Sequence, residues 1–231
     1  MSKARADMAL AWLERNGSKA GLAAMARYNI PSEHAFGVPM NRIQKLAKEL
    51  GRDHELALAL WETGRYEARL LAAYVDDPAK VTSAQMDKWR RGFDNWGVVD
   101  TICFALFDRT PHAWAKVAQW SRKKGEFEKR AAFALLWSLA LHDKRASDEK
   151  FVEGLALIER AAEDDRNFVK KAVSMALKAI GKRNASLEKA AGAVAARLAE
   201  SPHASARWIG TDALKELGLA LPQAPKRRRK P

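Results

Sequence analysis

The sequence has a single cysteine and no long apolar run. Cys103 is the only cysteine among 231 residues, so no disulfide can form within the chain. Its apolar neighbours in TICFALF predict a buried structural thiol rather than a nucleophile. No segment approaches the roughly 20 apolar residues of a membrane-spanning helix, and the initial MSKARADMALAWLERNG contains no signal-peptide core. We therefore expect a soluble, cytoplasmic protein of a reducing compartment, associated at most with the bacterial nucleoid.

The motifs of metal, nucleotide and serine-hydrolase chemistry are also missing. The sequence contains no G-x-x-x-x-G-K-[ST], no G-x-G-x-x-G and no G-x-S-x-G. One cysteine cannot complete a zinc site, and the histidines lack metal-ligand spacing; they are His34, His54, His112, His142 and His203. We expect neither a metal ion nor a small-molecule cofactor.

Acidic residues are scarce relative to basic ones. The chain has 28 Asp and Glu against 41 Lys and Arg, a formal net charge of +13. Five of these cations lie in residues 222–231, and removing them leaves +8 for the body. Such a body attracts polyanions, with nucleic acid the first candidate and an anionic membrane surface the second. We expect nucleic acid and no membrane, and we expect 222–231 to be a disordered, polyanion-binding tail.

Strand patterns are absent, because no alternating Val/Ile/Thr stretch is bounded by turns. Apolar residues recur instead at three- and four-residue steps, as in RYEARLLAAYV and NFVKKAVSMALKAIG. A hydrophobic content of 48% excludes a disordered chain. Turn residues divide the sequence into roughly a dozen helices of about 9 to 16 residues. The breaks are Asn16-Gly17, Pro31, Gly51, Gly64, Asp77-Pro78, Thr110-Pro111, 144–147, Asn184 and Pro202.

Four of these helices carry a cation near their start. Arg130, Lys171 and Arg207 are 41 and 36 residues apart, close to the roughly 35 to 47 residues of a helix pair in HEAT-like arrays. Arg69 lies 61 residues before Arg130, an interval that needs an extra, irregular helix pair. The pattern predicts one domain, 1–221, folded as an all-α, right-handed superhelical array of HEAT-like antiparallel helix pairs (an α-solenoid). The cations either decorate helix starts, which the macrodipole disfavours, or form a row facing an anionic partner.

The segment FDNWGVVDT is the most informative part of the sequence. Asp94 or Asn95 caps a helix that begins at Trp96. Trp96 and Asp100 are then four residues apart, so an indole and a carboxylate share one helix face. A carboxylate in an apolar helix needs a partner, since burying it unpaired costs several kcal/mol. From spacing alone, a structural ion pair with Arg130 is the favoured interpretation.

Several segments together resemble a known family. The DNA alkylation repair enzymes, which comprise the AlkD-like DNA glycosylases, contain in the same order segments similar to EARLLAAYVDDP, FDNWGVVD, EKRAAFALLWSLALHDK, DDRNFVKKAV and ARWIGTDALKEL. FGVPMNRIQKLAKEL resembles the family's N-terminal block. The resemblance runs from about Phe36 to Leu217 and does not rest on any single motif.

This resemblance implies HEAT-like repeats that cradle duplex DNA and release N3- or N7-alkylated purines. Trp96 and Asp100 match the family's catalytic tryptophan and aspartate, and Arg130 matches its active-site arginine. Met175 stands where the family has an aromatic residue, usually tryptophan, a departure that puts catalysis in doubt and leaves DNA binding intact. The alkylated purine is already cationic, so it leaves without a general acid. Asp100 then stabilises the oxocarbenium-like sugar and positions a water, Arg130 keeps Asp100 ionised, and Trp96 contacts the sugar face.

Residues expected at the DNA are Arg69, Lys170, Lys171, Lys182, Arg183, Arg207 and Met175. Solvated helix ends are the alternative for Lys170, Lys171, Lys182 and Arg183. The leading hypothesis is a monomeric DNA glycosylase for alkylated purines in double-stranded DNA. A catalytically silent protein that binds damaged or branched DNA is the alternative, for which Met175 is the best argument. A protein-binding helical scaffold is a third hypothesis, and the charge of +8 argues against it unless the partner is acidic.

Overall fold

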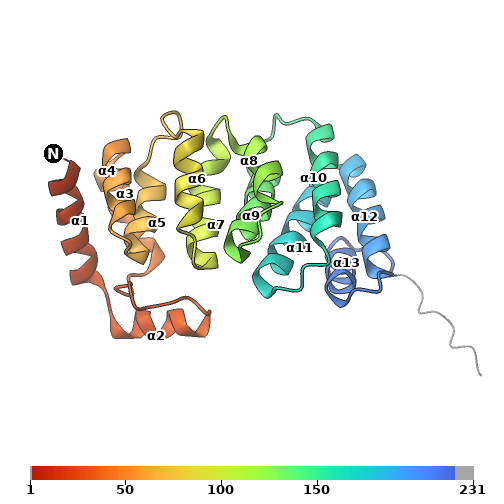
Figure 1. Cartoon of the computed structure of the whole chain (residues 1–231), viewed down its shortest axis with the longest axis horizontal. Helices are drawn as coiled ribbons and strands as arrows, with labels where there is room; N and C mark the ends of the chain where they lie inside the picture. The colour runs from red at the N-terminus through yellow and green to blue at the C-terminus, as the bar shows by residue number, and fades with distance from the viewer. Residues whose placement is uncertain (1, 222–231) are drawn as a thin grey trace, which may run out of the picture. The chain divides into compact units, whose positions relative to one another are not determined.

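The computed structural model describes residues 2–221, and all regular secondary structure in that range is helical. This part of the chain contains thirteen α-helices and one short 3-10 helix, and the α-helices follow one another along it (Figure 1). The all-α prediction is confirmed. The elements are α1 (Ser2–Asn16), α2 (Lys19–Arg27), α3 (Met40–Leu50), α4 (His54–Glu62), α5 (Tyr66–Val75), α6 (Ser83–Arg91), α7 (Trp96–Ala105), η1 (Phe107–Arg109), α8 (Ala113–Trp120), α9 (Glu126–His142), α10 (Asp148–Ala161), α11 (Asn167–Gly181), α12 (Ala185–Ala199) and α13 (Ala204–Glu216).

Helix boundaries follow the caps and turn residues of the sequence. Gly51, at the end of α3, has a φ of 69°, in the left-handed region that glycine adopts without strain. Five helices begin after a side chain that accepts a hydrogen bond from the backbone N–H three residues later; these caps are Ser18, Asp53, Thr82, Asn95 and Asn184. Local chemistry therefore decides where these five helices start.

The chain divides into two compact units, and the boundary falls between Ser138 and Leu139, within α9. The prediction of one repeat domain over residues 1–221 stays a prediction. The basic tail predicted for residues 222–231 lies outside the described residues.

Aromatic side chains join α4, α6, η1 and α8 into one layer of the first unit. Trp61 of α4 stacks on Trp89 of α6, with ring centroids 4.4 Å apart. Phe107 of η1 continues the row, 6.0 Å from Trp89 and 5.9 Å from Trp120 of α8. Trp89, Phe107 and Trp120 are fully buried. Burying this much aromatic area stabilises the layer and fixes α6 and α8 relative to each other.

The other layer of this unit consists of α5, α7 and the first part of α9. α5 packs on α7, and Cys103 of α7 is fully buried with its Sγ atom 3.6 Å from the Ala131 carbonyl oxygen of α9. Ser138 Oγ donates a 3.3 Å hydrogen bond to the Cys103 carbonyl oxygen. Burial raises the pKa of the Cys103 thiol well above its ordinary value, because a thiolate would be desolvated there. The prediction of a buried structural thiol is confirmed.

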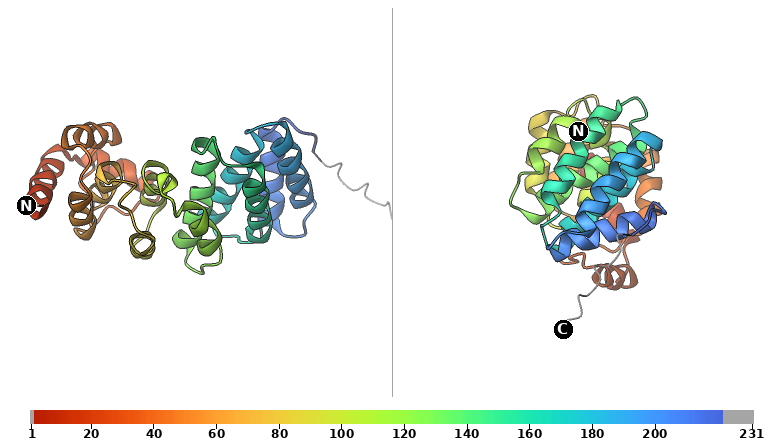
Figure 2. Two further views of the ribbon diagram at one scale, coloured as in Figure 1. Left: turned by 90° about the horizontal axis from the view of Figure 1, so that it is seen from above. Right: turned by 90° about the vertical axis from the view of Figure 1, so that its right-hand side faces the viewer.

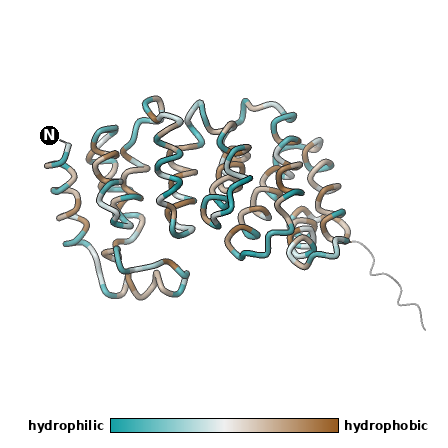
Figure 3. The backbone as a smooth tube through the Cα atoms, viewed as in Figure 1, coloured by the Kyte–Doolittle hydropathy of each residue, from teal (hydrophilic) through white to brown (hydrophobic). Residues whose placement is uncertain are grey.

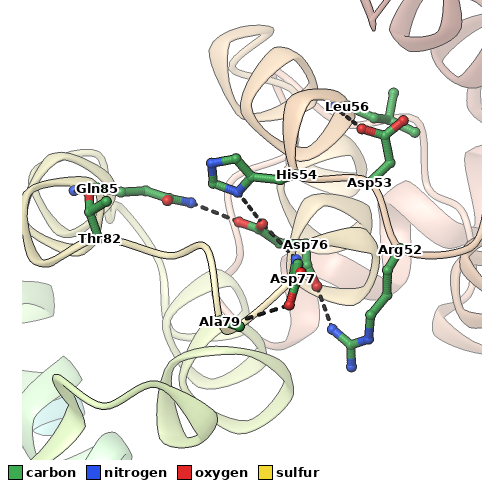
Figure 4. A network of polar contacts seen from close by, with 9 residues as sticks. All are labelled: Arg52, Asp53, His54, Leu56, Asp76, Asp77, Ala79, Thr82 and Gln85. Atoms are coloured by element: carbon green, nitrogen blue, oxygen red, sulfur yellow. Dashed lines mark hydrogen bonds and ion pairs between the residues drawn. The ribbon is translucent and has the colours of Figure 1, made fainter.

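A buried carboxylate ties α4, α5 and α6 together (Figure 4). Asp76 directly follows α5 and is fully buried. Its carboxylate lies 2.7 Å from His54 Nδ1 and accepts 2.7 Å hydrogen bonds from Gln85 Nε2 and from the Asp77 backbone N–H. Burial raises the pKa of Asp76, while the hydrogen bonds with His54 and Gln85 oppose that rise. These bonds satisfy the buried charge and hold the connection from α5 to α6 in place.

In the second unit, α11 packs against α13 and α10 against α12; Figure 2 shows the helices of this unit from two further directions. α12 and α13 approach closely at Gly210, where a Cβ atom would overlap the backbone of Ala195 and Ala199. Hydrophobic and hydrophilic residues alternate along the helices, as the brown and teal segments of Figure 3 show. This amphipathic pattern is typical of helices that bury one face. Between residues 2 and 221, no helix is long and apolar enough to cross a membrane.

Candidate functional site

The start of α7 presents the tryptophan and the carboxylate singled out by the sequence. Asn95 caps the helix by accepting a 2.9 Å hydrogen bond from the backbone N–H of Val98. The helix therefore begins at Trp96, as predicted, and Asn95 rather than Asp94 is the cap. Trp96 and Asp100 both remain partly accessible to solvent, whereas Val98 is fully buried in the core.

Asp100 and Arg130 form a two-point ion pair between α7 and α9. Arg130 Nε donates to one carboxylate oxygen at 3.0 Å, and Arg130 Nη2 donates to the other at 2.6 Å. The Arg130 side chain is only 7% exposed, whereas the Asp100 side chain is 19% exposed. Because each carboxylate oxygen has a second lone pair, the guanidinium orients Asp100 without using all of its accepting capacity. The ion pair expected from spacing is present.

The electrostatics of the pair are a balance between burial and charge. Burial raises the pKa of the Asp100 carboxyl above its ordinary value, because the ionised form loses hydration. The Coulomb attraction and hydrogen bonds of Arg130 oppose that rise. Asp100 is thus a desolvated carboxylate whose ionised form depends on Arg130.

The indole of Trp96 is held by a contact far along the sequence. Trp96 Nε1 donates a 2.8 Å hydrogen bond to the carbonyl oxygen of Tyr28, just after α2. The segment that follows Tyr28 is itself fastened to α5, because buried Glu67 accepts hydrogen bonds of 2.7 to 3.1 Å from three successive backbone N–H groups. Those donors belong to Phe36, Gly37 and Val38. Sequence reasoning missed Tyr28 and Glu67, since no local pattern links them to α7.

Tyr66 of α5 closes the other side of the first turn of α7. A Cβ atom at Gly97 would lie 2.6 Å from the Tyr66 hydroxyl oxygen, so a larger residue directly after Trp96 would displace it. Burial raises the pKa of Tyr66 to about 12, and the negative charges of Glu67 and Asp94 add to the rise. The phenol therefore stays protonated next to the site. The glycine after Trp96 is the one sequence signal that could have pointed to this contact.

The predicted cationic row occupies equivalent helix positions but is not uniform. The four cations are each the fourth or fifth residue of their helices: Arg69 of α5, Arg130 of α9, Lys171 of α11 and Arg207 of α13. The long interval before Arg130 contains the pair α6 and α7, and the fifth residue of α7 is Asp100. The extra helix pair therefore keeps the repeat register. At the position where the other four helices have a cation, α7 has Asp100, the carboxylate that Arg130 binds.

Two members of that row, Arg69 and Arg207, donate hydrogen bonds to backbone carbonyl oxygens. Arg69 Nη1 donates a 3.0 Å hydrogen bond to the Gly92 carbonyl oxygen, and its guanidinium lies 4.8 Å from the Trp61 ring. Arg207 is exposed, and its Nη1 donates to the carbonyl oxygens of Ser201 and Pro202 at 2.9 and 2.5 Å. Arg69 therefore supports the loop that precedes α7.

The second unit presents a separate basic surface on α11 and α13. Lys171 is exposed, and Lys170 Nζ lies 5.1 Å from the ring centroid of Trp208, which is 41% exposed. Met175 lies one turn beyond Lys171 and is partly exposed. An exposed tryptophan beside a lysine suits contact with a nucleotide, and sequence reasoning did not select Trp208.

The basic residues that follow α11 have protein partners. Lys182 pairs with Glu216 at 2.5 Å. Arg183 donates to the carbonyl oxygens of Ala140 at 2.6 Å and Asp143 at 3.0 Å, and it lies 4.0 Å from the Phe151 ring centroid. Arg183 thus satisfies carbonyl groups at the C-terminal end of α9.

Comparison with known proteins assigns first a class and then a family. A solved structure with a TM-score of 0.75 is described as a new family of proteins related to the HEAT-like repeat DNA glycosylases with affinity for branched DNA structures; it shares 19% identity and covers 93% of this chain and 97% of that chain. The fold is therefore that of a HEAT-like helical repeat protein. A designed armadillo repeat protein is also similar, at 15% identity, 85% and 99% coverage and a TM-score of 0.34. No curated protein matches significantly.

The sequence itself gives the family. The family model described as DNA alkylation repair enzyme matches residues 9–217, which is most of the chain. The chain belongs to this family, as the resemblance of its segments predicted. The matched range includes Trp96, Asp100 and Arg130.

Proposed function

We propose that the protein is a DNA glycosylase that hydrolyses the N-glycosidic bond of N3- or N7-alkylated purines in duplex DNA. The observation that carries this proposal is the partly exposed Asp100 carboxylate, oriented at two points by Arg130 and one helical turn from Trp96. The Asp100 carboxylate is largely desolvated, unlike a carboxylate on an open surface. It nevertheless keeps a face that is accessible to a ligand, which a purely structural ion pair would not need. Membership of the alkylation repair family supports the same chemistry.

The substrate needs little help with its leaving group. Alkylation at N3 or N7 makes the purine cationic, so the bond to C1′ breaks with its electron pair passing to the base, which departs neutral. The sugar becomes an oxocarbenium ion, and water then adds at C1′ and loses a proton to solvent. The protein must mainly stabilise positive charge and place that water.

Each site residue has a role in this reaction. Asp100 stabilises the developing charge at C1′ and holds the water, and its desolvation strengthens both interactions. Arg130 is a positioning residue that keeps Asp100 ionised and fixed. Trp96, held by the Tyr28 carbonyl oxygen, places its ring face against the electron-poor sugar.

The basic surface of the second unit is expected to bind the duplex through the phosphates of the DNA backbone. Lys170, Lys171 and Trp208 have exposed or partly exposed side chains suited to phosphate and nucleotide contact. Lys182, Arg183, Arg207 and Arg69 have protein partners, so we expect smaller contributions from them.

A catalytically silent DNA-binding protein is the second candidate. Met175 cannot offer the flat aromatic wall that the resemblance leads one to expect at its position. The structural neighbour related to HEAT-like repeat DNA glycosylases is described as having affinity for branched DNA. On this hypothesis the Asp100–Arg130 pair would only join α7 to α9.

Release of free 7-methylguanine and 3-methyladenine from methylated duplex DNA decides between the two. We expect Asp100→Asn to abolish release while changing DNA affinity only a few-fold. Asp53→Asn is the matched control, because it also removes a paired carboxylate and asparagine keeps the helix cap. Tight DNA binding without release by the native protein would establish the silent binder, and equal release by native protein and Asp100→Asn would exclude Asp100 from catalysis.

A further inference from the structure

A second basic site lies in the first unit, where α6 and α8 end. α6 ends in Arg90-Arg91, and Arg122-Lys123-Lys124 follows the C-terminal end of α8. Their side chains border an open pocket of about 530 Å³, whose lining includes Arg90, Arg91, Arg122 and Lys123. Asp87 is the only acidic residue in that lining. Neither the sequence motifs nor the proposed reaction uses this pocket.

The negative charge of Asp87 is already matched by the protein. Lys116 Nζ lies 2.6 Å from its carboxylate, and Trp120 Nε1 donates a 2.8 Å hydrogen bond to it. Burial acts to raise the pKa of Asp87, but the hydrogen bonds from Lys116 and Trp120 outweigh it and the pKa is lowered. Asp87 therefore joins α6 to α8. Arg90 forms an ion pair with Glu128 of α9, which leaves Arg91, Arg122 and Lys123 as the cations of the pocket without an acidic partner in the described part of the chain.

Three of those cations are exposed and available. Arg91, Arg122 and Lys123 have no hydrogen-bond or salt-bridge partner for their side chains anywhere in residues 2–221. Arg91 is the last residue of α6. The turn that carries Arg122 and Lys123 is fixed, because the Lys123 backbone N–H donates a 3.0 Å hydrogen bond to the Trp120 carbonyl oxygen. Cations stabilise helix C-termini, but three unpaired cations around one pocket exceed that need. The mutual repulsion of these cations destabilises the compact state, and their combined field attracts an anionic ligand.

The pocket belongs to a different layer from the proposed catalytic residues. α6 and α8 lie in the layer joined by the Trp89–Phe107–Trp120 row. Asp100 and Arg130 come from α7 and α9, in the other layer. A ligand in the pocket therefore contacts helices that do not carry the proposed catalytic groups.

We propose that this pocket binds a backbone phosphate of nucleic acid, at a site separate from Asp100. Guanidinium groups bind phosphate oxygens at two points, and Lys123 adds a point charge. Helix C-termini present carbonyl groups rather than N–H donors, so the pocket lacks the backbone cradle that holds a small free phosphate. A polyanion does not need such a cradle, because its neighbouring phosphates add to the attraction. The inference rests on the DNA-binding part of the proposed function and not on base release.

The test compares the salt dependence of duplex binding by full-length variants. Arg122→Gln/Lys123→Gln should weaken binding to an unmodified duplex and lower the slope of log K against log salt by about 0.9 for each phosphate that the variant no longer neutralises. Arg160→Gln/Lys189→Gln is the matched control, since it removes the same charge from exposed positions of α10 and α12. Equal unfolding temperatures would show that all of these proteins are folded. Equal slopes for the two double variants would overturn the proposal.

A second measurement distinguishes the source of the phosphate. Amide NMR signals of residues 119–124 should shift with duplex DNA and stay unchanged with inorganic phosphate at the same total phosphate concentration. Shifts of equal size with inorganic phosphate would overturn the nucleic-acid source and define a small-anion site. Absence of duplex binding by the native protein would refute the proposed function as well, whereas native binding with an unchanged Arg122→Gln/Lys123→Gln variant refutes only this pocket.

Discussion

Asp100 is a carboxylate on which two opposing effects act. Burial between α7 and α9 raises its pKa, and Arg130 opposes that rise through two hydrogen bonds. The arrangement keeps an anion in a poorly hydrated place, where its field acts strongly on a nearby cation. The same desolvation makes Asp100 dependent on Arg130, so the pair behaves as a unit.

Removal of the guanidinium should therefore change the pH dependence of base release. Base release requires ionised Asp100, so activity falls as the pH drops through its pKa, which lies above the ordinary value of about 3.9. Arg130→Gln removes the interaction that holds this pKa down, and the acid limb of the rate profile should move to higher pH. Single-turnover rates across pH measure the shift, with Arg130→Lys as the control that keeps the charge. An acid limb at the same pH in native protein and Arg130→Gln would contradict this role.

Met175 allows a second test at the residue scale. Met175→Trp supplies the flat aromatic surface that the resemblance leads one to expect, and an aromatic contact is worth about 0.5–1.5 kcal/mol. We expect base release to rise about two- to tenfold, with little change in duplex affinity. Met175→Leu should leave the rate near that of the native protein. A rise with leucine as large as with tryptophan would exclude an aromatic effect.

At the scale of elements, equivalent helices of the repeat have different roles. The fourth or fifth residue is a cation in α5, α9, α11 and α13 and a carboxylate in α7. Residues at this one repeat position therefore have three different roles. Arg69 supports a loop, Asp100 and Arg130 form an ion pair, and Lys171 is exposed. Repeat position places a side chain, and its neighbours decide what that side chain does.

The packing of α12 against α13 yields a prediction for stability. A Cβ atom at Gly210 would overlap the backbone of Ala195 and Ala199, so Gly210→Ala must push the helices apart. Overpacking of this kind costs about 1–3 kcal/mol, and denaturant unfolding should report that loss. Gly192→Ala is the control, because its Cβ atom would meet only the end of the Leu219 side chain at 2.7 Å. Equal effects of the two substitutions would show that backbone contact is not the cause.

At the scale of the whole molecule, positive charge is unevenly distributed. Residues 1–138 have 22 Lys and Arg against 16 Asp and Glu, and residues 139–221 have 14 against 12. With residues 222–231 left out, the larger surplus lies in residues 1–138, which contain Asp100 and the pocket between α6 and α8. Because residues 139–221 have a surplus of only two positive charges, Lys170 and Lys171 of α11 are important to any duplex contact there.

Charge reversal on α11 tests that contribution. Lys170→Glu/Lys171→Glu should weaken binding to every duplex regardless of sequence and reduce the salt slope by about 1 to 2, because phosphate contacts carry no base information. Titrations of labelled duplex at several salt concentrations measure both effects. Arg160→Glu/Lys189→Glu changes the net charge equally on α10 and α12. Unchanged affinity in Lys170→Glu/Lys171→Glu would remove α11 from the DNA surface.

The sequence by itself determined the helices and the residues most worth examining. Apolar spacing and caps such as Asn95 act within a few residues, so helix starts, the all-α fold and the position of Trp96 beside Asp100 could be predicted from it. Tertiary structure decided which charges meet. A buried carboxylate needs a cation, so the sequence already points to the Asp100–Arg130 pair, but the two-point geometry of that pair comes from helix packing. Arg183 serves the end of α9 rather than solvent, and the ends of α6 and α8 come together around Asp87. These pairings depend on the packing of segments that are distant in the chain, and local patterns carry no information about that packing.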